Sequence, residues 1–358
     1  MGSNQASEFD SRLAASRRPQ VTAVLNSVAW RLAIAAFLLL GTHAYAMAEQ
    51  EDSCLNRTVP VNVFTREGLV GEGLTAADFR GKYRGKPVEI VSATRVAKGI
   101  RIVLLLDTSE SMWGNASGSL QFGIEMIRNL VRSAPNGTSF ALLTFASHVE
   151  DRVEFGRPPE SLQKELDALA TRNWGHYKGA GRRTALFDSL LAALDLLQPP
   201  RPGDVIFLAS DGGENASQNH ESRVVTGFLT SGTRLFLYLT ASPPQLRMRT
   251  PVEAFAPSTI VNLTDVTGGE SFPYPWSDAL MPHPMSESQS ATEAREQELL
   301  PSLARSVMRE IFGFYSLQIK LPKRVDKVRE WNLEAVGPAG KRNLFTRVVY
   351  PRLLAPCQ

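Results

Sequence analysis

The stretch Ile100–Met112 constrains the fold of this chain more than any other, and it reads I-R-I-V-L-L-L-D-T-S-E-S-M. Ile102–Leu106 is an almost unbroken aliphatic run, which is typical of a strand buried on both faces of a parallel sheet. The run ends in Asp107, Ser109 and Ser111, three short oxygen-bearing side chains at alternate positions. Open α/β sheets bind ligands at the carboxyl ends of their strands, and hard oxygen ligands favour Mg²⁺, Mn²⁺ or Ca²⁺. The same residues also suit a polar turn followed by a helix N-cap, so this stretch alone leaves both interpretations open.

The segment Asp107–Ser111 resembles the D-x-S-x-S motif of von Willebrand factor type A (VWA) domains, which forms their metal-ion-dependent adhesion site. The resemblance implies two further ligand loops. Gly181–Asp188 is similar to the family's threonine loop, with Thr184 as the ligand, and Leu208–Asn215 is similar to its aspartate loop, with Asp211 as the ligand. The metal ligands implied by the resemblance are Asp107, Ser109, Ser111, Thr184 and Asp211. We expect one divalent cation there, Mg²⁺ or Mn²⁺ before Ca²⁺, because Mg²⁺ keeps several waters where carboxylates are few. We also expect this loop to be exposed.

The threonine loop departs from the family pattern, since Arg182 and Arg183 stand where small residues are usual. Two cations at this place either weaken metal binding or attract an acidic partner. Glu110 and Glu214 are acidic neighbours of predicted ligands. Such side chains are solvated by default, and hydrogen bonding to the ligand loops is the alternative. The predicted partner-binding rim comprises Arg182, Arg183, Glu110 and Glu214.

A wider resemblance covers residues 59–351 and points to a family of exported, VWFA-related domains. It rests on V-N-V-F-T-R-E-G, L-T-A-A-D-F and G-K-P-V-E-I before the metal loops, and on W-N-L-E-A-V after them. The implied fold class is α/β: a Rossmann-like VWA domain with a mostly parallel central sheet and helices on both faces. A small β-sandwich, built from the N-terminal and C-terminal segments, accompanies it.

Four parts of the 358-residue chain follow from these patterns. They are a targeting segment (1–50), an N-terminal β segment (51–98), the VWA domain (99–313) and a C-terminal β segment (314–358) that packs with 51–98. From Ile100 the pattern predicts strand, helix, two strands, two helices, strand, helix, two strands and a closing helix, with Thr259–Leu263 leading into a glycine segment. Each terminal β segment has too few strands to be stable alone. Cys54 and Cys357 lie at the outer ends of these segments, so we predict a disulfide between them, with two unpaired cysteines as the alternative.

The amino terminus predicts the compartment. Arg17, Arg18 and Arg31 precede Leu32–Leu40, an apolar run of the length of a signal-peptide core, and small-x-small cleavage sites follow at 44–48. We therefore expect export to the periplasm or beyond the cell. An uncleaved membrane anchor remains the alternative, and only in that case do we expect a membrane partner.

Composition and motifs exclude several other classes. A net charge of +3 spread along the chain does not predict nucleic-acid binding, and the locally basic stretch Lys320–Arg352 is interpreted as the solvent face of strands. The chain contains no G-x-S-x-G, H-E-x-x-H or phosphate-loop motif, and its five histidines lack ligand spacing. Asp107 cannot be a dehalogenase-type nucleophile, because Ser109 occupies the place of the second aspartate.

The resulting prediction is an exported, metal-dependent module that binds or adheres to a protein offering a carboxylate, and not an enzyme. Two carboxylates leave coordination positions of the cation open without supplying a general base, which suits binding better than hydrolysis. A metal-free structural module of the cell envelope is the first alternative. A metal-dependent enzyme with a base from outside the motifs is the second.

Overall fold

The computed structural model describes residues 54–65, 70–113, 119–174, 183–240, 251–273, 289–336 and 347–357. The chain divides into two units, Met1–Cys54 and Leu55–Gln358, and nearly all of the described residues belong to the second. The predicted targeting segment, residues 1–50, lies outside the described ranges. Within those ranges, no helix combines the length and the apolar character needed to cross a membrane.

The α/β part is organised around a six-stranded sheet in the order β6-β5-β4-β7-β8-β9. Its strands are β4 (Arg101–Asp107), β5 (Ser139–Phe145), β6 (Val149–Val153), β7 (Val205–Ser210), β8 (Arg234–Leu239) and β9 (Ser271–Pro273). Neighbouring strands run parallel except β5 and β6, which are antiparallel. Every residue of β4, β7 and β8 is buried, which accounts for the continuous apolar runs in their sequences.

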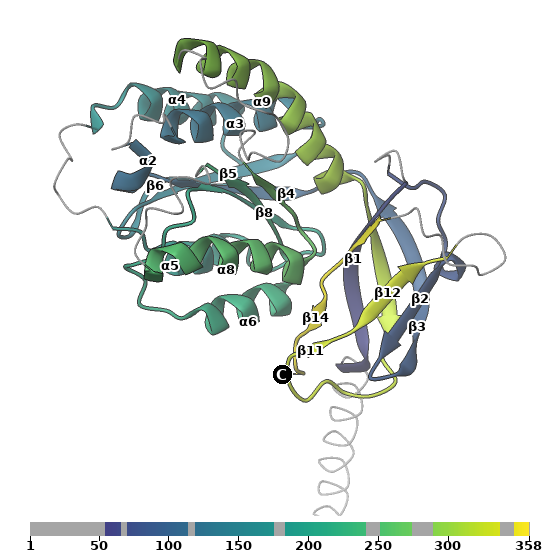
Figure 1. The fold of residues 1–358 in the computed structure, drawn as a ribbon. Helices are drawn as coiled ribbons and strands as arrows, with labels where there is room; N and C mark the ends of the chain where they lie inside the picture. Colours follow the sequence, from purple (N-terminus) through teal and green to yellow (C-terminus); the bar gives the residue numbers. More distant parts are fainter. Residues whose placement is uncertain are drawn as a thin grey trace, which may run out of the picture. The chain divides into compact units, whose positions relative to one another are not determined.

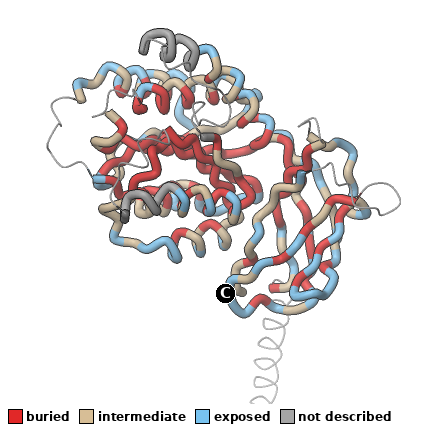
Figure 2. Tube along the Cα trace, viewed as in Figure 1, coloured by how far each residue is buried: buried red, intermediate tan, exposed pale blue. Residues whose placement is uncertain are grey.

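Helices cover both faces of this sheet (Figure 1). One face carries α3 (Ser119–Ser133), α4 (Pro159–Thr171) and α9 (Gln289–Phe312); the other carries α5 (Leu186–Leu196), α6 (Glu221–Ser231) and α8 (Pro251–Thr267); the short α2 (Glu110–Trp113) follows β4. Alternate residues of β4 face opposite sides, so Ile102 and Leu104 pack into one core and Val103 and Leu105 into the other. Figure 2 shows the buried residues concentrated in the sheet and along the inner sides of the helices.

Helix α8 is missing from the sequence prediction. The sequence pattern treats Thr259–Leu263 as the second of two strands before the closing helix. In the structure these residues lie inside α8, between β8 and β9. Ile260 and Leu263 are buried against the sheet at the i, i+3 spacing of one helix face. Two residues in one turn are too weak a periodic signal to identify a helix from the sequence.

Strands from both ends of the chain form an antiparallel unit, named here the β unit. Its six-stranded sheet has the order β12-β2-β3-β10-β1-β13, and a separate pair joins β11 to β14. The strands are β1 (Asn56–Phe64), β2 (Phe79–Tyr83), β3 (Lys86–Val96), β10 (Phe314–Lys320), β11 (Arg329–Glu330), β12 (Asn332–Ala335), β13 (Arg347–Val349) and β14 (Leu353–Leu354), and a 3₁₀ turn, Ala76–Asp78, precedes β2. β10 lies between β1 and β3, so N-terminal and C-terminal strands are intermixed in one sheet over a shared core. The predicted fold class is confirmed, and both cysteines, Cys54 and Cys357, are disulfide-bonded.

A buried arginine joins the α/β part to the β unit. The guanidinium of Arg234, at the start of β8, donates to the backbone oxygens of Ile311 (2.7 Å) and Glu310 (3.3 Å) at the end of α9. It also donates to the Oδ1 of Asn62 in β1 (3.1 Å) and lies 4.2 Å from the ring centre of Phe314, the first residue of β10. Burial lowers the pKa of Arg234, and the nearby Glu310 opposes that effect. The Nδ2 of Asn62 also donates to the carbonyl of Glu310 (2.7 Å), so Arg234 and Asn62 together satisfy the carbonyls where the chain leaves α9 for the β unit.

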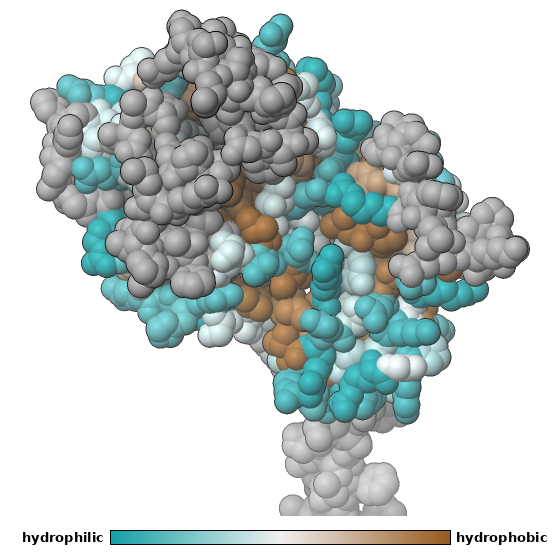
Figure 3. Space-filling view, in the orientation of Figure 1, coloured by the Kyte–Doolittle hydropathy of each residue, from teal (hydrophilic) through white to brown (hydrophobic). Residues whose placement is uncertain are grey.

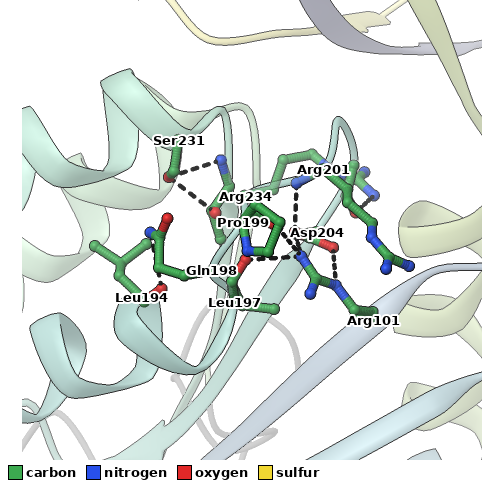
Figure 4. A network of polar contacts seen from close by, with 11 residues as sticks. Arg101, Leu194, Leu197, Gln198, Pro199, Arg201, Asp204, Ser231 and Arg234 are labelled. Atoms are coloured by element: carbon green, nitrogen blue, oxygen red, sulfur yellow. Dashed lines mark hydrogen bonds and ion pairs between the residues drawn. The ribbon is translucent and has the colours of Figure 1, made fainter. Parts of the chain in front are cut away.

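A second polar network holds the amino ends of β4 and β7 (Figure 4). Arg101 donates through Nε to the Oδ1 of Asp204 (3.0 Å) and through a terminal nitrogen to its Oδ2 (2.5 Å). The same nitrogen donates to the carbonyls of Leu197 (2.7 Å) and Pro199 (2.8 Å). Both charged groups are almost completely buried, so each depends on the other for its stability in the fold.

We predict that Arg234→Met destabilises the protein by about 2–4 kcal/mol, because the carbonyl of Ile311 and the side-chain oxygen of Asn62 lose their buried donor. Urea unfolding measures the change. Arg132→Met is the matched control, since Arg132 is exposed on α3, and it should change the free energy of unfolding by no more than about 0.5 kcal/mol. Equal effects of the two substitutions would contradict the junction role of Arg234.

Candidate metal centre

The first predicted ligand, Asp107, ends β4 at the carboxyl edge of the sheet. Its side chain is 0% exposed, so the expectation of an exposed loop is wrong for this residue. Its Oδ1 accepts the backbone N–H of Ser109 (2.9 Å), and its Oδ2 accepts the hydroxyl of Ser210 from the neighbouring strand β7 (2.7 Å). The two bonds fix the orientation of the carboxylate between two strands.

The serines of the first loop lie close to this carboxylate. Ser109 is 1% exposed and Ser111 is half-buried, and their hydroxyl oxygens are 3.2 Å apart. Because Ser109 also binds Asp107 through its backbone N–H, the loop gathers three oxygen-bearing side chains in a single turn.

The threonine and aspartate loops bring the remaining two ligands together over Gly213. The backbone N–H of Gly213 donates to the Oδ1 of Asp211 (3.0 Å). A Cβ placed on Gly213 would lie 3.2 Å from that same oxygen and 3.4 Å from the Oγ1 of Thr184. The side-chain oxygens of these two predicted ligands therefore border the small space that a side chain at Gly213 would fill.

Asn215 ties these two loops to each other. Its Oδ1 accepts the backbone N–H of Thr184 (2.8 Å), and its own N–H donates to the carbonyl of Thr184 (2.9 Å). The N–H of Ala216 donates to that carbonyl as well (3.0 Å). Thr184 and Asp211 are each 3% exposed, and these hydrogen bonds fix the backbone of Thr184 against the aspartate loop.

The charges in this site favour a cation. Burial, and after it the negative charge of Asp211, raise the pKa of Asp107 to about 7, against the opposing effect of the hydrogen bonds from Ser109 and Ser210. Two buried carboxylates beside three hydroxyls are a hard-oxygen donor set. Within the described ranges, no group of three or more His, Cys, Asp or Glu side chains gathers in a way that would hold a metal. A cation held here would therefore depend on hydroxyl oxygens as well as on the two carboxylates.

Comparison with known proteins decides the family of this part. Residues 102–214 match the family model of the von Willebrand factor type A domain. These residues belong to a VWA domain. Among curated proteins, none matches the sequence.

Several solved structures resemble the chain at low identity. A von Willebrand factor type A protein from Catenulispora acidiphila is 10% identical with a TM-score of 0.43, over 81% of this chain and 72% of that one. Proximal thread matrix protein 1 from the mussel byssus is 15% identical with a TM-score of 0.42, over 63% of this chain and 48% of that one. This chain thus spans about half the length of the mussel protein. An aerotolerance-related membrane protein from Bacteroides fragilis is 12% identical with a TM-score of 0.39, over 60% of this chain and 98% of that one.

Among the residues predicted to form the partner-binding rim, Glu214 is occupied by hydrogen bonds within the VWA domain. The carboxylate of Glu214 accepts four bonds: from the N–H groups of Phe187 (3.0 Å), Ala216 (3.1 Å) and Ser217 (2.9 Å) and from the hydroxyl of Ser217 (2.7 Å). Glu214 thus holds the aspartate loop against the start of α5. This is the alternative given above, in which the side chain forms hydrogen bonds to the ligand loops.

The other predicted rim residues lie on the threonine loop and on α2. Arg183 is exposed and donates to the carbonyl of Asn215, while Arg182 lies outside the described residues. Glu110 is half-buried at the start of α2. Their contact with a partner remains a prediction.

Sequence reasoning did not identify Ser210 or Asn215 as supporting residues of the VWA site. Ser210 becomes a partner of Asp107 only because β4 and β7 pair with Leu106 opposite Ala209, which places the next residues side by side. Ser210 lies between the apolar run of β7 and Asp211. Knowing that β4 and β7 are adjacent strands would have been necessary to predict its contact with Asp107. His148 is exposed in the turn between β5 and β6, His220 is exposed before α6, and His176 lies outside the described residues.

We predict that the metal-free protein loses stability as the pH rises through the range in which folded Asp107 ionises. The unfolded carboxyl has a pKa of 3.8 and the folded one a pKa of about 7, so the folded state binds the proton more tightly. Its favourable contribution is complete below the lower value and is lost, by at most about 4 kcal/mol, as the pH approaches and passes the upper value.

Urea unfolding in EDTA at pH 5 and pH 8 measures this dependence. Asp107→Asn should flatten it, because asparagine does not titrate. Added Mg²⁺ should stabilise the parent more at pH 8 than at pH 5, because protons compete with the metal for the carboxylate. An unchanged pH dependence in Asp107→Asn would assign the titration to other groups.

Proposed function

We propose that this protein is an exported VWA module that binds a carboxylate of a protein partner through one divalent cation. The observation that carries the proposal is a pair of buried carboxylates, Asp107 and Asp211, whose charges interact at the carboxyl edge of the sheet. Loops that carry Ser109, Ser111 and Thr184 flank this pair. Asp107, Ser109, Ser111, Thr184 and Asp211 would hold the cation. Mg²⁺ and Mn²⁺ fit this set better than Ca²⁺, which usually takes more charged oxygen ligands.

The chemistry available to such a cation favours binding over catalysis. Bound metal would supply an electrophilic position that a partner's carboxylate can occupy. Hydrolysis would require a general base within hydrogen-bond reach. Of the carboxylates near the ligand loops, Glu214 already accepts four hydrogen bonds, and Glu150 accepts the hydroxyl of Thr108 (3.0 Å). The protein residues around the cation would thus orient a ligand and exclude water from the buried side.

A metal-free structural module of the cell envelope is the second candidate. The observation in its favour is that Asp107 already accepts two hydrogen bonds from the protein, which stabilise its charge without a cation. Metal binding distinguishes the two candidates.

We predict that calorimetric titration with Mg²⁺ or Mn²⁺ gives one site per chain. Asp211→Asn should weaken the affinity at least about tenfold, since one of two charged ligands is lost. Asp265→Asn is the matched control because Asp265 is exposed on α8, and it should leave the affinity unchanged. If the parent protein gives no heat at millimolar metal, the structural module is the better description.

The partner is sought by affinity capture from the envelope of the source organism, with parent protein and Asp211→Asn compared in Mg²⁺ and in EDTA. A partner of the metal site should be captured only by the parent and only in Mg²⁺. Capture that is indifferent to both changes would contradict metal-dependent binding.

We predict that the positive charge at Arg183 speeds association with an acidic partner at low salt. Arg183→Lys keeps the charge and should keep the association rate, whereas Arg183→Ala should slow association at low salt and match the parent at high salt. Because Arg183 also donates to the carbonyl of Asn215, the lysine variant separates the effect of charge from that of loop structure. Identical rates for the parent and the alanine variant would remove this role.

A further inference from the structure

The β unit is much more basic than the chain as a whole. Its described residues in 54–98, 314–336 and 347–357 include fourteen Lys and Arg against six Asp and Glu, whereas the whole chain has a net charge of only +3. The excess is not spread evenly over the strands. It concentrates at the end of the β unit where β1 begins and β10 ends.

The turn between β2 and β3 supplies half of the exposed charge at this end. Lys82, Arg84 and Lys86 are all exposed, while Tyr83 between them is completely buried and anchors the hairpin. Tyr83 pairs with Lys86, and Lys82 with Pro87, so the turn is a tight one. Arg84 and Gly85 adopt positive φ angles of 50° and 76° in it.

The segment that follows β10 supplies the other half. Lys320, Arg324 and Lys327 are exposed, and Lys320 pairs with Glu89 at the start of β3. Asp326, in the same segment, lies close enough to the hairpin turn for the charge of Arg84 to act on its carboxylate. Its pKa is lowered first by hydrogen bonds from backbone N–H groups and then by the positive charges of Arg329 and Arg84.

We name the six exposed cations the basic end; they are Lys82, Arg84, Lys86, Lys320, Arg324 and Lys327. In the part of the chain that the structure describes, none of them forms an ion pair within 4 Å. Exposed like charges held together in this way repel one another, and an anionic partner relieves the repulsion. The basic end therefore has the charge complementary to a polyanion.

The position of the basic end within the chain identifies the polyanion. Asn56, the first residue of β1, pairs with Lys320, and the N–H of Leu321 donates to the carbonyl of Leu55 (2.9 Å). The chain that precedes the β unit, which carries the apolar run Leu32–Leu40, is therefore attached at the basic end. Val328, one of two large apolar side chains exposed among the described residues, lies beside Lys327 and is 37% exposed. In Figure 3 the lower end of the β unit presents a mostly hydrophilic surface.

We propose that the basic end binds the surface of an anionic phospholipid bilayer. An aliphatic side chain among lysines and arginines suits the interface of lipid headgroups, whereas single-stranded nucleic acid is usually bound on exposed aromatic side chains. The surface uses none of the metal ligands, so this interaction is independent of the proposed carboxylate binding. A bilayer contact would fix the β unit at the membrane while the metal loops remain available to a partner.

Binding of the full chain to vesicles tests the proposal. Vesicles of phosphatidylcholine alone are compared with a mixture of two parts phosphatidylcholine and one part phosphatidylglycerol, at low and at high salt and in EDTA. We expect tighter binding to the mixed vesicles, a preference that falls as salt screens the charges and that EDTA does not change. Any binding through residues 1–53 is common to all variants, so the preference between vesicles is the measured quantity.

The triple variant Lys82→Gln, Arg84→Gln, Lys86→Gln should lose most of that preference. Each cation near an anionic surface contributes roughly fivefold, so the three together predict a decrease in partition coefficient of up to about 100-fold at low salt. The matched control replaces three exposed cations of the α/β part, Arg132, Arg157 and Lys164, by glutamine and should keep the preference. Circular dichroism of both variants checks that they are folded.

Three results would overturn the proposal: no preference for the mixed vesicles, equal losses in the two triple variants, or tighter binding of the parent to a duplex oligonucleotide than to mixed vesicles at the same salt. The last result would assign the basic end to nucleic acid. Failure of the metal titration leaves these outcomes unaffected, because the vesicle experiment is performed in EDTA.

Discussion

The two carboxylates buried at the carboxyl edge of the central sheet are the constraint on which the rest of the VWA domain depends. Asp107 is 0% exposed and Asp211 is 3% exposed. Burial raises the pKa of Asp107, and the negative charge of Asp211 adds to that increase. Unpaired charge in such a place is strongly destabilising. Ser109 and Ser210 donate hydrogen bonds to Asp107, and Gly213 donates one to Asp211, which stabilises the two charges. The same loops carry hydroxyls that a cation would use. The site is thus built around charge that the protein alone compensates only in part.

The register of β4 and β7 places these groups. The five paired residues from Ile102 to Leu106 are apolar, and polar pairs close both ends: Arg101 with Asp204 at the amino end, and Asp107 with Ser210 at the carboxyl end. A slip of one residue would break both pairs at once and would leave a buried charge at each end without its partner. The apolar run supplies the stability of the strands, and the polar ends make a single register the favourable one.

Local patterns explain what the sequence could predict. The strand Ile102–Leu106 and the short oxygen-bearing residues after it are contiguous, so pattern and motif together predicted the fold class, which is confirmed. The ligand positions remain a prediction. Helix α8 has too weak a periodic pattern to be predicted. The burial of Asp107 beside β7 and the role of Glu214 at the start of α5 depend on contacts between segments distant in the sequence. The clustering of the basic end is of the same kind. Lys82 and Arg324 come from opposite ends of the chain, and they cannot be placed on one surface until β3 is known to pair with both β2 and β10.

Arg234 shows how the two parts of the molecule share one stability. Its guanidinium binds the end of α9, Asn62 of β1 and the ring of Phe314, so the helix that closes the α/β part and the strands of the β unit meet at one buried cation. Detaching the β unit would expose Arg234 and would remove Asn62, which accepts a hydrogen bond from Arg234 and donates one to the carbonyl of Glu310 (2.7 Å). The β unit is therefore more than a linker to the VWA domain, because its removal would destabilise the helix packed on the opposite side of the junction. A surface that fixes the β unit in space would, through the same buried contacts, also restrain the orientation of the metal loops.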